Sequence, residues 1–106
     1  MNKQAIELEK LFQQLTQRLQ SVQKWDLQSP SQTALLSTQP FAVDTLSPEQ
    51  WLQWIFVPKM LGLIEQKQPL PSGFSIAPYF EEVWNNSEEM EPVLDVIRAI
   101  DEVCAC

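Results

Sequence analysis

The chain has 106 residues, enough for one domain with a single hydrophobic core, which we place at residues 1–106. Its net charge of −7 disfavours direct binding to nucleic acid or to an anionic membrane, since both depend on clustered Lys and Arg. No apolar run is long enough to cross a bilayer, and the amino-terminal residues lack the apolar stretch of a secretory signal, so we predict a cytoplasmic protein.

Residues 2–24 form the first predicted helix, because apolar side chains recur there at steps of three and four. The opposite face is rich in Gln, Lys and Glu. Two arrangements remain open: the stripe packs inside the domain's own core, or it meets a second copy as in a coiled coil, which would make a homodimer. The stripe consists of Ala5, Leu8, Leu11, Phe12, Leu15, Leu19 and Val22.

A connector rich in Pro, Ser, Thr and Gln follows at residues 26–46. We expect one short helical turn at 31–36, with Pro30 in the first helical position. The apolar side chains of Phe41 and Val43 should hold the connector against the core.

The second helix begins at Ser47, with Pro48 in the first helical position and Gln50 completing a capping box. The sequence that follows, WLQWIFVPKMLGLIEQK, is apolar on nearly every side, which is typical of a central helix. We therefore expect residues 48–67 to form the middle of the bundle.

Pro58 interrupts this apolar helix, because proline has no N–H for the carbonyl of Trp54 and costs about 3 kcal/mol in a straight helix interior. One interpretation is a kink, helped by Gly62, that lets the helix bend around its neighbours. A second is a groove beside Trp51 and Trp54 that takes a partner helix or a small apolar ligand. A third is a pair of separate helices.

Residues 68–78 form a predicted loop, because they hold three prolines and one glycine. A short helix should follow at 78–84 and a last helix after Ser87. The apolar face of the last helix is expected to consist of Met90, Val93, Leu94, Ile97, Ile100 and Cys104.

The last helix also carries a run of acidic side chains. They are interpreted either as its solvent face or as a docking face for a basic partner, because a patch of one charge speeds association with its complement. The run consists of Glu88, Glu89, Glu91, Asp95, Asp101 and Glu102.

The absence of histidine removes the commonest general base and the commonest metal ligand. Cys104 and Cys106 alone are too few for a zinc site, and we interpret them as incidental thiols of a frayed tail. Near Tyr79, the neighbouring Glu81 and Glu82 point about 100° apart on a helix and do not form a dyad. We expect no catalytic residue, no cofactor and no metal.

Five short stretches carry a resemblance to the YqcC-like family of small bacterial proteins. This resemblance implies an all-helical bundle with no assigned role, and some descriptions of the family bear the label tRNA pseudouridine synthase C. Such a synthase is a much larger α/β enzyme with a basic RNA cleft, so the label implies at most an accessory role here. The stretches are STQPF at 37–41, WLQW at 51–54, PKM at 58–60, KQPLP at 67–71 and APYFE at 77–81.

We therefore predict an all-α bundle of about four main helices, with residues 48–67 as the central member, kinked at proline. The expected function is a non-catalytic protein-interaction or accessory module. The alternatives are an accessory component of tRNA pseudouridine synthesis, acting with a larger catalytic subunit, and a binder of small apolar ligands. The candidate interaction surface consists of Trp51, Trp54, Pro58, Pro69, Leu70, Pro71, Tyr79, Glu88, Glu89 and Glu91.

Overall fold

The computed structural model describes residues 3–71 and 73–105, and within these ranges every regular element is helical, with no strand. In chain order the elements are α1 (Lys3–Ser21), α2 (Gln32–Leu35), η1 (Pro40–Ala42), α3 (Pro48–Trp51), η2 (Leu52–Phe56), α4 (Val57–Glu65), α5 (Ala77–Val83), η3 (Glu88–Met90) and α6 (Glu91–Val103).

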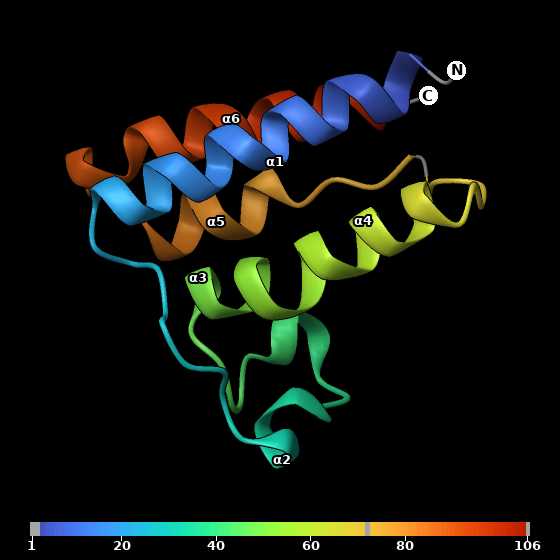
Figure 1. The fold of residues 1–106 in the computed structure, drawn as a ribbon. Coiled ribbons are helices and arrows are strands. Elements are labelled where there is room, and N and C mark those ends of the chain that lie inside the picture. The colour runs from blue at the N-terminus through green and yellow to red at the C-terminus, as the bar shows by residue number, and fades with distance from the viewer. Residues whose placement is uncertain (1–2, 72, 106) are drawn as a thin grey trace.

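The predicted all-α bundle is confirmed, with α1, α5, α6 and the continuous helix α3–η2–α4 as its main members. Figure 1 shows α1 and α6 side by side along one edge of the bundle. Two bonds tie this pair together: the Arg18 guanidinium donates to the Pro92 carbonyl (2.6 Å) and the Gln4 amide donates to the Val103 carbonyl (3.1 Å).

The stripe predicted on the first helix is buried inside the domain, which is the first of the two arrangements left open above. Its central side chains are almost completely covered and meet the apolar face of α6, as expected for a bundle core. Leu52, Phe56 and Met60 of the central helix close this core from the other side. The buried side chains of the stripe are Leu8, Phe12, Leu15 and Leu19.

None of the helices in the described ranges combines the length and the hydropathy that a membrane span requires.

The connector projects from the bundle as a small layer made of α2 and η1 (Figure 1). Two details of its prediction are wrong. The hydroxyl of Ser31 caps α2 by accepting from the Ala34 N–H (3.1 Å), so Pro30 precedes the cap instead of opening the helix. Val43 is 59% exposed, so of the two side chains predicted to hold the connector only Phe41 packs against the core.

Candidate functional site

An aromatic cluster brings three of the sequence motifs together. The ring of Phe41 stacks on that of Tyr79, with centroids 4.0 Å apart and an interplanar angle of 9°, and lies 4.8 Å from Trp51. Trp51 in turn stacks on Phe56 at 5.2 Å. The structure thus places two predicted site residues, Trp51 and Tyr79, on either side of Phe41. Phe41 was not predicted as a site residue, although its STQPF motif could have suggested it.

The backbone that aims Phe41 into this cluster is strained. Phe41 and Ala42 have φ angles of 56° and 48°, in the left-handed region that costs a residue other than glycine about 1 kcal/mol or more. The turn is held by bonds from the Ala42 N–H to the Gln39 carbonyl (2.9 Å) and from the Leu46 N–H to the Ala42 carbonyl (2.8 Å). Ring packing against Tyr79 and Trp51 therefore offsets an unfavourable local conformation.

Asp26 fastens the start of the connector to the central helix. Its backbone N–H donates to the Gln53 side-chain oxygen and its carbonyl accepts from the Gln53 amide, both at 2.8 Å. Its carboxylate accepts from the Gln50 amide and from the indole N–H of Trp54, both at 3.1 Å. The polar end of Trp54, a predicted site residue, is thus bonded within the protein. Gln53, the only buried polar residue among those described, was missed by the sequence analysis.

A π-helical segment, η2, accounts for the proline in the central helix. The Val57 N–H bonds to the carbonyl of Leu52, five residues back, so the helix widens by one residue just before Pro58. Pro58 then stands in the first turn of α4, where the register has changed and a missing N–H is tolerated. The helix runs on without a break, so the alternative of two separate helices is wrong. The Pro58 side chain itself is exposed.

The predicted capping box at the start of this helix is confirmed. The Ser47 N–H donates to the Gln50 side-chain oxygen at 2.9 Å. In return, the Ser47 side chain accepts from the backbone N–H of Gln50. The Gln50 side chain therefore caps the helix start through its oxygen and bonds to the Asp26 carboxylate through its N–H group.

The QPLP loop exposes its prolines to solvent and partly buries its leucine. Pro69 and Pro71 are exposed, whereas Leu70 is half-buried against the core. Further along, the Gly73 N–H donates to the carbonyl of Cys104 at 2.7 Å, which ties the loop to the end of α6.

Asp101 departs from the prediction of a solvent-facing acidic run. Its carboxylate accepts from the backbone N–H groups of Ile76 (2.9 Å) and Ala77 (2.7 Å) and from the Ser75 hydroxyl (3.1 Å). The two N–H groups are otherwise unpaired donors at the start of α5. Asp101, which belongs to the neighbouring helix α6, therefore caps α5. Its role was missed because the donors lie some 25 residues away in sequence.

The three predicted glutamates of the acidic face differ in their surroundings. Glu91 pairs with the Arg98 guanidinium at 3.4 Å, and Arg98 also holds Glu81 at 3.0 Å. Glu88 and Glu89 are exposed in η3 and make no ion pair within the described residues. Of these three glutamates, the two without an ion pair therefore both lie on η3.

Cys104 is completely buried, so the interpretation of a frayed tail is wrong for this residue. Burial, and to a lesser degree the nearby Asp101 carboxylate, raises the pKa of the Cys104 thiol, which disfavours the reactive thiolate. Cys106 lies outside the described residues. Within the described ranges, no three His, Cys, Asp or Glu side chains converge as a metal site would require.

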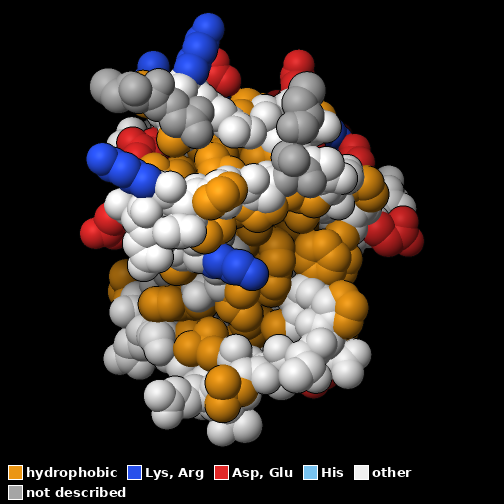
Figure 2. Space-filling view, turned by 90° about the vertical axis from the view of Figure 1, so that its right-hand side faces the viewer, with side chains coloured by type: hydrophobic (Ala, Val, Ile, Leu, Met, Phe, Trp, Pro, Cys, Tyr) orange, Lys and Arg blue, Asp and Glu red, His pale blue; other side chains and the backbone are white. Residues whose placement is uncertain are grey.

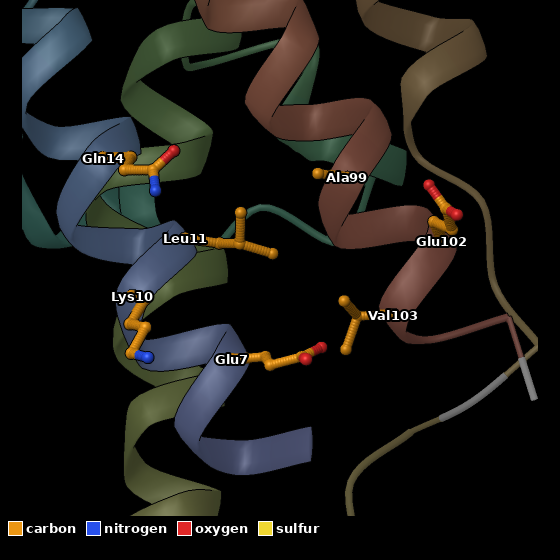
Figure 3. A pocket seen from close by; sticks show the side chains of 7 residues that line it. All are labelled: Glu7, Lys10, Leu11, Gln14, Ala99, Glu102 and Val103. Carbon is orange, nitrogen blue, oxygen red and sulfur yellow. The ribbon is translucent and has the colours of Figure 1, made fainter. Parts of the chain in front are cut away.

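Hollows lie on two sides of α1. One, of about 550 Å³, is lined by residues of α1 and α6, and Figure 3 shows Leu11 and Val103 facing each other across it with Glu7 at its margin. Two others, of about 550 and 250 Å³, separate α1 from α4. Neither Trp51 nor Trp54 lines any of these three hollows, although the groove interpretation placed the binding site beside them.

Relatives of the chain carry little functional description. The chain is 37% identical over 92 residues to an uncharacterized protein of Haemophilus influenzae, a match that covers 87% of each. It is 45% identical over 70 residues to YqcC of Escherichia coli, covering 66% of this chain and 64% of YqcC. The solution structure of Escherichia coli YqcC superposes with a TM-score of 0.85 at 32% identity, covering 98% of this chain and 90% of that one.

A third relative, from Pectobacterium carotovorum subsp. carotovorum, is named tRNA pseudouridine synthase C. It is 34% identical over 65 residues, which make up 61% of this chain but only 17% of that protein. The family model described as DUF446, tRNA pseudouridine synthase C, matches residues 7–103. With nearly its whole length matched by that model and its fold shared with YqcC, the chain belongs to the YqcC-like DUF446 family.

Proposed function

We propose that the chain is a non-catalytic accessory module that acts beside a tRNA pseudouridine synthase. The proposal is carried by the Pectobacterium protein of that name, in which the segment similar to this chain fills only 17% of the length. More than four fifths of that protein thus lies outside the shared segment. A segment that forms most of one protein and a small part of a longer one is well explained by joint action of the two parts.

The chemistry of the chain supports an accessory role over a catalytic one. Its conspicuous polar side chains are engaged in holding the fold: Asp26 anchors the connector, Asp101 caps α5, and Arg98 collects three carboxylates. An enzyme that acts on tRNA needs a basic surface. A chain of net charge −7 is suited to bind such an enzyme, and unsuited to bind the tRNA itself.

The proposal is tested by measuring pseudouridine formation in tRNA by the organism's tRNA pseudouridine synthase C, with and without this chain. The chain alone is expected to form no pseudouridine, and its addition at a stoichiometric amount is expected to raise kcat/KM at least twofold. An unrelated protein of similar size and charge serves as control. Pseudouridine formed by the chain alone would contradict the non-catalytic role, and an unchanged rate would contradict the accessory role.

A further inference from the structure

The two hollows between α1 and α4 adjoin at Glu9, which borders both of them, and together they are called the α1–α4 groove. Figure 2 faces the end of the molecule where α1 begins and α4 ends, and hydrophobic side chains gather there around a basic one. The apolar lining of the groove consists of Ala5, Ile6, Phe12, Val57, Leu61, Ile64 and Leu70.

The spacing of the lining residues suits a helix as the occupant. On α4 they are Val57, Leu61 and Ile64, at steps of four and three. On α1 the lining extends from Ala5 to Thr16, about 16 Å of helix, or three turns. Two helices that present such stripes to a shared gap provide the holes into which side chains of a third helix insert.

Exposure of the lining shows that this groove lacks an occupant from the described parts of the chain. Leu61 is 40% exposed although it sits in the middle of α4, and Ile6, Ile64 and Leu70 are each half-buried. Covering these side chains removes apolar surface from water, which favours binding of an apolar helix face.

The charges of the groove specify the occupant further. Glu9 lies midway along it and Lys67 at the end near Leu70, and neither makes an ion pair within the described residues. A complementary helix therefore carries Lys or Arg at the centre of its apolar face and Asp or Glu at one end. We propose that the α1–α4 groove binds one amphipathic helix of this charge pattern, supplied by the partner synthase; this inference rests on the proposed function.

The test compares Leu61→Glu with Val83→Glu in binding to the organism's tRNA pseudouridine synthase C, measured by isothermal titration calorimetry. Both positions are similarly exposed, at 40% and 42%, and both changes add one negative charge, but Val83 lies on α5, outside the groove. Leu61→Glu is expected to weaken binding at least tenfold, whereas Val83→Glu should stay within twofold of the wild type. Thermal unfolding checks that both variants remain folded.

A second measurement places the contact directly. In the complex, backbone amide NMR signals of residues 5–16 and 57–68 should shift more than those of α5 and α6. Suppose that the wild type binds, but that Leu61→Glu binds equally well or that the shifts centre on α5 and α6. The groove is then not the binding site, while the proposed function stands. If the wild type does not bind the synthase, the proposed function fails, and this inference with it.

Discussion

Two aspartates that look like surface acids in the sequence hold the molecule together. Asp26 and Asp101 each place a carboxylate against donors more than 20 residues away, and each thereby fixes a segment without regular structure. Their partners include backbone N–H groups that would otherwise lack acceptors, and leaving such groups unpaired costs more than the bond itself contributes.

Replacing Asp101 by alanine is expected to lower the free energy of unfolding by about 1–3 kcal/mol, because the Ile76 and Ala77 N–H groups lose their acceptor. Urea unfolding followed by circular dichroism measures this loss. Asp95→Ala is the control, since Asp95 is an exposed aspartate on the same helix whose ion pair with Arg98 is worth little. Equal losses in the two variants would contradict the capping role.

Tyr79 is the only tyrosine, so its titration is observed without interference. Burial, and secondarily the Glu49 carboxylate, raises the pKa of Tyr79 above the ordinary 10.0. Absorbance of the phenolate is expected to show a midpoint above 10.0, and Glu49→Gln should lower that midpoint without abolishing the shift.

The sign of the linked stability follows from the same shift. The folded protein holds the Tyr79 proton more tightly than the unfolded chain does. The protonated Tyr79 therefore contributes to the free energy of unfolding in full below the ordinary pKa, and this contribution is lost as pH rises through the folded-state pKa. A midpoint at or below 10.0 would contradict the packing of Tyr79 against Phe41.

At the scale of elements, features set by neighbouring residues were predictable and features set by distant ones were not. The capping box at Ser47 and the apolar stripe of α1 depend on residues within one or two turns, and both were predicted correctly. The π-helical segment η2 turns Gln53 and Trp54 toward Asp26, more than 25 residues upstream. Nothing in the local sequence specifies that contact.

The same reasoning applies to the candidate site. The motifs identified Trp51 and Tyr79, but the left-handed turn that brings Phe41 between them is stabilised by packing across the bundle. The groove between α1 and α4 was not predicted, because a hydrophobic pattern shows which side chains are apolar and not which ones remain uncovered. Leu61, for example, belongs to the helix predicted at the middle of the bundle and is 40% exposed.

Gln53→Leu tests how strongly the central helix holds the connector. Leucine has a similar volume but offers no donor or acceptor, so the Asp26 N–H and carbonyl lose both 2.8 Å bonds. The expected loss is about 2 kcal/mol in the free energy of unfolding, measured by urea denaturation. Gln17→Leu, at an exposed position of α1, should change stability by less than about 0.5 kcal/mol. A Gln53→Leu variant as stable as the wild type would show that the two Gln53 bonds do not stabilise the attachment of the connector.

At the scale of the whole molecule, the exposed pair Glu88 and Glu89 lies apart from the apolar groove. These two glutamates are on η3, whereas the groove runs between α1 and α4. Charge acts at long range and governs the rate of encounter, while buried apolar contacts govern how long a complex lasts. The two surfaces are therefore expected to affect different rate constants for the same partner.

The double variant Glu88→Lys, Glu89→Lys should slow association with the synthase several-fold at low salt and leave the dissociation rate nearly unchanged. Both side chains are exposed and unpaired within the described chain, so the free energy of unfolding should stay within about 0.5 kcal/mol of the wild type. Surface plasmon resonance at two salt concentrations separates the rates. An unchanged association rate at low salt would show that Glu88 and Glu89 do not speed association with the synthase.

Both proposals require that this chain forms a complex with a tRNA pseudouridine synthase. The most direct test is the mass of an equimolar mixture of the two purified proteins, measured by light scattering during size-exclusion chromatography at about 10 μM. A single peak is expected, with a mass equal to the sum of the synthase and the 12.2 kDa chain. Two peaks at the separate masses would contradict both proposals.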